Sequence, residues 1–399
     1  MIAPHSLEDF FSAYFEQTPL HVDRNDQSYF AGVYSVADVE DALTVGARDP
    51  ENFALVKFGN PEVSVDAFTY ERPSARWRTS DRGPAKAVDA RKVIGCFADG
   101  YTLIVNDAAL FNARLQRFSN RIQRELLAYC QANVYLTPPA AQGFQIHHDS
   151  HDTLTAQIEG EKTWRIYKPL VELPLEAQPF DVATNLDNVE LVREVHLRPG
   201  DTLYIPRGYL HEAKTSSTQS LHITFALAPI RVAEVLDFVS RIASVRDVEL
   251  RRALRPSMVD ADGFPERFGQ FFESRLTATF SGERVESALD GALYEMFRIT
   301  RPNTNGAFEQ ALRCANITDG MRLRIDDGVP FMIRDRQGAV DLLIAGKSIE
   351  FPAFCKAAIL QIQQGPVTVA ELDPALSPEH RNPLIRLLVL EGLVLIDET

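Results

Sequence analysis

The segment between Asn133 and Leu227 consists of short runs rich in β-branched and aromatic residues, separated by proline and glycine. The runs occupy residues 132–136, 153–158, 163–167, 203–205 and 221–225, and the turns between them contain Pro138, Gly160, Pro169, Pro199 and Gly208. Runs of this length and composition predict β-strands. Many short strands in one segment indicate a sandwich or barrel, such as a jelly roll.

The sequence on both sides of this segment is predicted to be largely helical, so the expected fold class is α+β. Ser6 is suited to begin a helix near the N-terminus, and apolar residues recur at helical spacing in residues 108–130 and 230–300.

The C-terminal part has a different pattern of predicted secondary structure. Helices are predicted at residues 354–363, 368–372 and 378–391, followed by a strand at 393–396. Three helices and then a strand outline a winged-helix module. We therefore divide the chain into residues 1–228, 229–305 and 306–399.

The chain is acidic, with 41 lysine and arginine residues against 55 aspartate and glutamate residues and a net charge of −14. Phosphate groups need a positive footprint, so we expect neither nucleic acid nor a membrane surface as partner. A basic protein is electrostatically easier to bind. No run approaches the roughly 18 apolar residues of a membrane span. The N-terminus also lacks the basic start and apolar run of a signal peptide, so we expect a cytoplasmic protein.

Six of the nine histidines lie between residues 147 and 222, which makes this segment the place to look for a metal site. His147 and Asp149 form a His-x-Asp pair. On a β-strand, residues two apart point to the same side, so these two side chains would bind one ion. The pair alone is a weak signal, and a turn histidine is the alternative for His147.

A third ligand has to come from elsewhere in the chain, and the candidate is His211, which follows a short apolar strand and a Pro-Arg-Gly bend. Two histidines and one carboxylate form a facial triad, which leaves three positions of an octahedral iron(II) ion open. Oxygen chemistry uses these positions for a chelating cosubstrate and O₂. A catalytic zinc ion would need only one open position.

The remaining histidines of the segment are weaker candidates for metal ligands. We expect His148 and His151 to be bystanders and His196 to be structural. His222 falls inside a predicted strand and has a core role or lines the pocket.

Three residues are candidates for binding a dicarboxylate. Lys162 begins a strand after the turn at Gly160, predicted as a hairpin turn, and a partly desolvated ammonium suits a carboxylate. Asn133 and Tyr135, two apart on another strand, are placed to add hydrogen bonds. The alternatives are an exposed turn lysine and ordinary strand packing.

These motifs, taken in order, resemble the JmjC-type ribosomal oxygenases, also described as the cupin-4 family of iron(II)/2-oxoglutarate hydroxylases. The resemblance is carried by residues 133–139, Gly143-Phe144 before His147-x-Asp149, residues 157–165 and residues 200–211. The N-terminal residues 11–20 are also similar. The resemblance covers about residues 1–228, and the ordered set is far more specific than any single motif.

The resemblance implies a double-stranded β-helix (a jelly-roll or cupin fold) that binds Fe(II), 2-oxoglutarate and O₂. It implies that His147, Asp149 and His211 hold the iron, and that Lys162 binds 2-oxoglutarate with help from Asn133 and Tyr135. It further implies that residues 1–228 are the JmjC-type oxygenase domain. A helical dimerisation segment (229–305) and a C-terminal winged helix (306–399) would follow it.

The sequence departs from the family pattern at the expected mouth of the pocket. Ile146 stands where relatives often have proline, and His148 where they often have tyrosine or another large residue. Late in the last barrel strand, where relatives can place a polar residue near the substrate, this chain has Thr224-Phe225-Ala226-Leu227. None of these departures touches the expected iron ligands.

We therefore predict a 2-oxoglutarate-dependent dioxygenase that hydroxylates an Arg or His side chain of a basic ribosomal protein. A homodimer is expected from the apolar stripe at Val232, Val235, Val239 and Ile242, for which packing within one chain is the alternative.

Two other functions stay open. The first is an oxygenase acting on a small molecule or a non-ribosomal peptide. The second is a non-enzymatic cupin and winged-helix regulator that binds nucleic acid. The helix at 378–391 has Arg381 and Arg386 opposed by Glu379 and Glu391, which is a poor charge pattern for a helix that reads bases.

Overall fold

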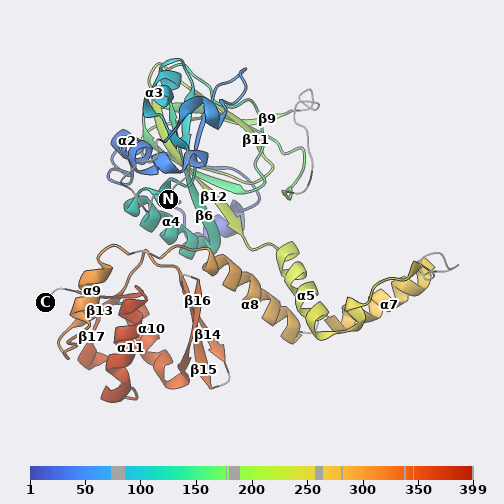
Figure 1. Cartoon of the computed structure of the whole chain (residues 1–399), viewed down its shortest axis with the longest axis vertical. Coiled ribbons are helices and arrows are strands. Elements are labelled where there is room, and N and C mark those ends of the chain that lie inside the picture. The colour runs from blue at the N-terminus through green and yellow to red at the C-terminus, as the bar shows by residue number, and fades with distance from the viewer. Residues whose placement is uncertain are drawn as a thin grey trace. The chain divides into compact units, whose positions relative to one another are not determined.

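The structure is a computed structural model that describes residues 1–72, 86–176, 178, 189–256, 264–279, 282–302, 304–336, 338–344 and 346–397. The chain divides into two compact units, Met1–Gln123 with Tyr129–Ala228, and Arg124–Ala128 with Pro229–Thr399 (Figure 1). The boundaries predicted at residues 228/229 and 305/306 stay predictions. Within the described ranges, none of the helices has the length and apolar character needed to cross a bilayer.

The first unit is built around a sheet of seven strands. Their spatial order is β1 (Leu20–Val22), β10 (Thr202–Ile205), β7 (Asp152–Glu159), β12 (Ser220–Pro229), β6 (Ala128–Thr137), β5 (Thr102–Val105) and β2 (Phe53–Val56). Seven of the eight β7 residues are buried, as expected of a strand covered on both faces. In β6, buried residues alternate with half-buried ones, and Asn133 and Tyr135 lie on the half-buried side.

A second, smaller sheet has the order β11 (Leu210–Thr215), β8 (Lys162–Tyr167) and β9 (Leu191–Leu197). The two sheets together make the jelly roll that the sequence predicts. The turn at Gly160 is where it was expected, but the hairpin is wrong, because β7 and β8 belong to different sheets. The Gln157 side chain donates to the carbonyls of Glu159 and Gly160, at 2.9 and 3.0 Å, and shapes the turn that passes from one sheet to the other.

Helices and short elements surround the sheets of the first unit. They are α1 (Leu7–Ala13), α2 (Val36–Val45), α3 (Ala90–Ala98), α4 (Ala113–Leu126), the 3₁₀ turns at Gly46–Arg48, Pro50–Asn52, Val65–Phe68 and Ala108–Leu110, and the β3 (Thr69–Glu71) and β4 (Lys86–Val88) pair. Ser6 caps α1 in a capping box with Asp9, so the predicted helix start is confirmed. The helix predicted over 108–130 is shorter than expected. It ends at Leu126 because Leu127 takes a left-handed conformation, and β6 begins at Ala128.

The second unit begins with helices and continues with small sheets. The helical elements are α5 (Val232–Arg246), the 3₁₀ turn Glu249–Arg251, α7 (Phe264–Thr279), α8 (Gly282–Arg298) and α9 (Ala307–Arg313). Two three-stranded sheets follow, β17 (Val367–Thr368), β13 (Arg322–Ile325), β18 (Val394–Ile396), and β14 (Phe331–Arg336), β15 (Ala339–Ile344), β16 (Lys347–Pro352). The 3₁₀ turn Ala353–Cys355 and α10 (Lys356–Gln364) lie between β16 and β17 in the chain, and the 3₁₀ turn Val369–Glu371 and α11 (Pro378–Leu390) lie between β17 and β18.

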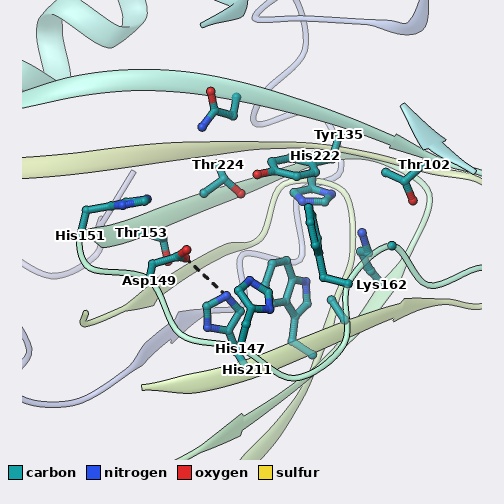
Figure 2. A pocket seen from close by; sticks show the side chains of 15 residues that line it. Thr102, Tyr135, His147, Asp149, His151, Thr153, Lys162, His211, His222 and Thr224 are labelled. Carbon is teal, nitrogen blue, oxygen red and sulfur yellow. Dashed lines mark ion pairs between the residues drawn. The ribbon is translucent and has the colours of Figure 1, made fainter. Parts of the chain in front are cut away.

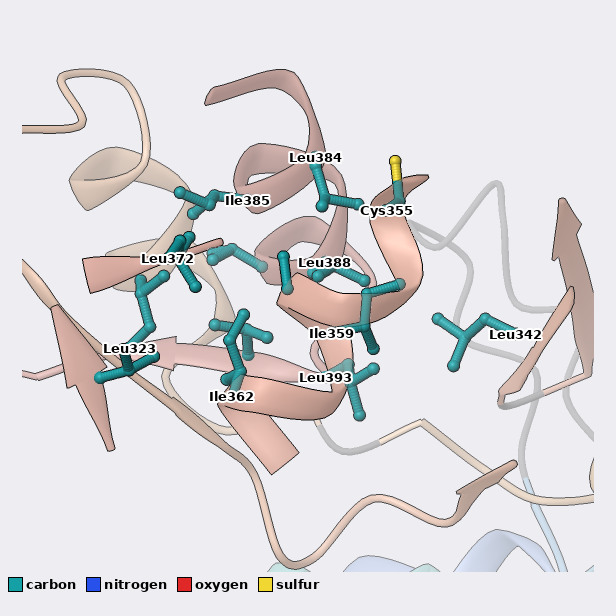
Figure 3. Packing of buried hydrophobic residues seen from close by; sticks show 14 of the residues in the cluster. Leu323, Leu342, Cys355, Ile359, Ile362, Leu372, Leu384, Ile385, Leu388 and Leu393 are labelled. Carbon is teal, nitrogen blue, oxygen red and sulfur yellow. The ribbon is translucent and has the colours of Figure 1, made fainter. Parts of the chain in front are cut away.

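One apolar cluster holds the C-terminal part of the second unit together. Ile359 of α10, Leu388 of α11 and Leu323 of β13 are all fully buried in it (Figure 3). The β14–β16 sheet was not foreseen from the sequence. The assignment of residues 306–399 as a winged helix stays a prediction.

Candidate metal centre

The segment around His147 is irregular rather than a regular strand, which corrects the expectation for the His-x-Asp pair. His147 forms one isolated antiparallel bridge, with His211, and the two residues exchange main-chain hydrogen bonds of 3.1 and 2.7 Å. Gly208 N donates to Asp149 O at 3.0 Å. The main chain is held at these points rather than in a regular strand ladder, and Asp149 faces His211.

The three predicted ligands converge. One donor atom from each of His147, Asp149 and His211 lies within 4.8 Å of the others (Figure 2). His211 Nε2 is 3.5 Å from Asp149 Oδ2, which is less than twice the usual metal–ligand distance of about 2.1 Å. Among the described residues, no other group of three histidine, cysteine or acidic side chains meets this criterion.

Hydrogen bonds at the far side of each imidazole set its orientation. Nδ1 of His147 lies 2.9 Å from Gln145 O, and Nδ1 of His211 lies 3.1 Å from Tyr209 O. A carbonyl only accepts, so each Nδ1 is the donor, and Nε2 is the ring atom left to bind an ion. The donor set therefore fits a divalent metal ion.

The protonation states also suit a metal. Burial, with His147 nearby, lowers the pKa of His211 to about 4, so its ring is neutral at ordinary pH. Burial opposes ionisation of Asp149, but the surrounding histidines, His211 and His147 foremost, together outweigh it and hold the pKa of this carboxyl below its usual value. A neutral imidazole at His211 and an ionised carboxylate at Asp149 are both able to bind a divalent ion.

The three ligands line one wall of a cavity of about 210 Å³. Asn133, Tyr135, Lys162 and His222 line the same cavity, from β6, β8 and β12 (Figure 2). The jelly roll thus brings together every residue named as a site candidate.

Lys162 is a buried cation rather than an exposed turn lysine. Its side chain is 4% exposed, and Nζ donates to Thr137 Oγ1 at 3.2 Å. No carboxylate of the described chain forms an ion pair with it. Burial lowers the pKa of Lys162 to about 7, because nothing nearby compensates the charge. A buried ammonium without a counter-charge favours an anionic ligand.

Tyr135 and His222 stack in the cavity, with ring centroids 4.8 Å apart and planes 2° apart. Burial and the charge of Lys162 hold the pKa of His222 well below its usual range, so its ring is neutral. Burial also raises the pKa of Tyr135, which keeps the phenol protonated. His222 Nδ1 is buried without a hydrogen-bond partner.

Asn133 also forms a hydrogen bond within the fold. Its Oδ1 accepts a 3.0 Å hydrogen bond from Asp107 N, which leaves its amide NH₂ as a donor for a ligand.

The other histidines divide as follows. His151 lines the cavity although it was expected to be a bystander, whereas His148 is not among the lining residues. His196 is at the surface, with Nε2 2.9 Å from Glu161 Oε2.

Sequence reasoning did not single out some lining residues, such as Thr102, Thr153 and Trp164. The strand period of two contains the signal for Trp164, which follows Lys162 by two positions on β8 and therefore faces the same side. Thr102 comes from β5, far away in sequence, and no local pattern indicates it.

Residues 108–235 match the family model of the JmjC domain. The chain carries a JmjC domain. Ribosomal oxygenase 1 of Gallus gallus is 33% identical over 228 residues, covering 56% of this chain and 35% of that protein. Ribosomal oxygenase 1 of Homo sapiens is 30% identical over 272 residues, covering 66% of this chain and 40% of that protein. The chain is thus similar to the ribosomal oxygenases, which confirms the resemblance of its motifs, and it spans less than half the length of these two relatives.

The fold of the JmjC chain is also that of a solved structure. YcfD, a ribosomal oxygenase from Escherichia coli in complex with cobalt and 2-oxoglutarate, aligns over 99% of both chains with a TM-score of 0.58 and 16% identity. At this identity the likeness shows a shared fold. It confirms the predicted JmjC jelly-roll core.

Proposed function

We propose that this protein is an Fe(II)- and 2-oxoglutarate-dependent dioxygenase that hydroxylates a protein side chain. One observation carries the proposal: the His147–Asp149–His211 triad and the buried, uncompensated Lys162 line the same cavity. A metal hydrolase needs the ligands but has no use for such an ammonium. An enzyme that binds a chelating dicarboxylate needs both.

The residues divide the work as follows. His147, Asp149 and His211 would hold Fe(II), and Lys162 would neutralise the distal carboxylate of 2-oxoglutarate. The Tyr135 hydroxyl and the Asn133 amide are placed to donate to the same ligand. When bound, the iron and 2-oxoglutarate supply the oxidising chemistry that uses O₂ to hydroxylate a C–H bond.

The chain itself excludes water from this chemistry. Trp164 is 6% exposed and lies beside His211, with ring centroids 5.9 Å apart. His222 is 2% exposed and contacts Trp164 edge to face. These rings leave Phe144, which is 40% exposed and also lines the cavity, on the side open to solvent. A substrate side chain would therefore enter past Phe144.

The substrate we propose is an Arg or His side chain of a ribosomal protein, and we propose that the reaction takes place in the cytoplasm. The relatives are named ribosomal oxygenases, and some are named histidyl-hydroxylases. The net charge of −14 suits a basic partner. We propose no nucleic-acid partner, because Arg381, one of two arginines on α11, is paired with Asp319 at 2.6 Å.

The decisive experiment compares intact masses of ribosomal proteins from cells with and without the gene. A species heavier by one oxygen atom should be present with the gene, absent without it and absent with His211→Ala. If all ribosomal masses are unchanged while small molecules or other peptides stimulate succinate release, the substrate proposal is wrong and the oxygenase proposal stands.

We further propose a homodimer formed through the helices of residues 229–305. Part of the predicted stripe is used within the chain, since Val239 is buried and α5 packs on α8. Val232 and Val245 of α5 remain 78% and 73% exposed, and Leu289 of α8 is 42% exposed. Light scattering should give twice the 44.7 kDa chain mass, and a single-chain mass would contradict the proposal.

A further inference from the structure

We propose that the loop at Glu16-Gln17, between α1 and β1, is a positioning element of the metal site. It holds the turn that carries His211, although it touches neither the ion nor the cavity. The inference rests on the metal site of the proposed function and extends it to the N-terminal segment.

The first link runs through Tyr209. His211 Nδ1 donates to the main-chain oxygen of Tyr209 at 3.1 Å, and this bond sets the angle of the imidazole. The hydroxyl of Tyr209 donates to Gln17 O at 2.8 Å. The residue that orients the metal ligand is therefore itself fixed at its other end by the loop.

The second link runs through Arg207, which is 7% exposed. Its guanidinium pairs with Glu16 and lies 3.9 Å from the fully buried carboxylate of Asp152. Its main-chain N donates to Asp152 Oδ1 at 2.9 Å. Asp152 follows Asp149 by three residues, so this network joins both ligand-bearing segments to the loop.

The same turn also fixes the second ligand. Gly208 N donates to Asp149 O at 3.0 Å. Gly208 has φ of +88°, and a Cβ there would meet Val171 O at 2.6 Å, so this turn lies against the main chain of Val171 and admits no side chain at position 208. A displacement of residues 207–209 would therefore move Asp149 and His211 together.

The Glu16-Gln17 loop is held in place by contacts of the segments on either side of it. β1 pairs with β10, placing Leu20 opposite Tyr204. The ring of Phe10 packs edge to face on Tyr204 at 4.9 Å, and the Tyr204 hydroxyl accepts from Glu16 N at 2.9 Å. Glu16 has φ of +56°, a conformation that glycine adopts more easily, but glycine would lack the carboxylate that binds Arg207.

The test uses the full chain with Co²⁺ as the probe. Tyr209→Phe removes only the bond to Gln17, and Glu16→Gln removes only the charge opposite Arg207. Tyr34→Phe is the matched control, because the buried Tyr34 hydroxyl donates to a main-chain oxygen, Asp38 O at 3.2 Å, in a contact unconnected to the ligand-bearing segments. Co²⁺ affinity and the visible spectrum of bound Co²⁺ are measured for each protein.

We expect Tyr209→Phe and Glu16→Gln to bind Co²⁺ about 3- to 10-fold more weakly, with altered Co²⁺ absorption bands. Tyr34→Phe should match the wild type in both. Wild-type affinity and spectrum in both loop variants would overturn the inference alone, and would leave the loop with a purely structural role. If Glu16→Gln fails to fold, Tyr209→Phe, which loses one oxygen atom, decides the matter. A wild-type chain that binds no Co²⁺ would instead refute the proposed metal site, and the inference with it.

Discussion

His147 and His211 exchange both main-chain hydrogen bonds across a single antiparallel bridge, and their imidazole centroids are 4.4 Å apart. The main chain, and not an ion, therefore brings two of the three ligands together. A site organised in this way loses little freedom when a metal binds, which favours affinity.

Metal removal should leave the fold intact. We expect chelation to leave the circular dichroism spectrum unchanged, while Co²⁺ in about 100-fold excess over its dissociation constant adds about 2.7 kcal/mol of stability. Thermal unfolding with and without Co²⁺ measures this. His211→Ala should abolish the stabilisation, whereas His196→Ala, at a surface histidine, should retain it. Loss of secondary structure on chelation would contradict a preformed site.

Binding of 2-oxoglutarate should weaken as pH rises through about 7. Lys162, whose pKa is lowered to about 7, is charged below that value and neutral above it, and only the ammonium attracts a carboxylate. At saturating Co²⁺, the dissociation constant should rise by up to about tenfold per pH unit above pH 7, with proton uptake on binding. Calorimetry in two buffers of different ionisation enthalpy measures both quantities.

Lys162→Arg provides the control, since a guanidinium stays charged throughout this range. Whatever its absolute affinity, this variant should show little pH dependence. Equal wild-type affinity at about pH 6 and about pH 8 would show that Lys162 does not titrate in the free protein as its burial suggests.

Tyr135→Phe and Asn133→Ala should have different effects. Tyr135→Phe keeps the stack on His222 and loses only the hydroxyl, so we expect the dissociation constant of 2-oxoglutarate to rise about 5- to 10-fold at unchanged stability. Asn133→Ala also breaks the bond to Asp107 N, so it should lower the free energy of unfolding by about 1 kcal/mol or more. Titration calorimetry and urea unfolding separate the two. Unchanged 2-oxoglutarate affinity in Tyr135→Phe would remove this hydroxyl from the ligand site.

The turn before Lys162 should tolerate no side chain at Gly160. Its φ is +63°, and a Cβ would lie 1.8 Å from Gln219 O. We expect Gly160→Ala to cost about 3 kcal/mol or more in the stability of the first unit. Gly59→Ala is the matched control, since Gly59 has φ of +76° with nothing within 4 Å of a Cβ, and it should cost about 1 kcal/mol. Equal urea midpoints for the two variants would contradict the clash.

Local patterns in the sequence predicted much of the architecture. Strand composition with proline and glycine between the strands indicated the jelly roll, and Ser6 indicated the start of α1, because both signals act over a few residues. The ordered motifs named the three ligand candidates and Lys162. What local patterns could not provide was pairing: the turn at Gly160 reads like a hairpin turn, yet its two strands belong to different sheets.

The sequence by itself determined which chemical groups this protein has for a metal and a dicarboxylate, since His, Asp and Lys at those positions are fixed by the chain. The tertiary structure decided whether they meet and in what state. His211 lies 62 positions beyond Asp149, and only the folded sheets place their side chains 3.5 Å apart. Burial between the two sheets also shifts the pKa of Lys162, and burial is a property of the whole fold, so no neighbouring residue in the chain reveals it.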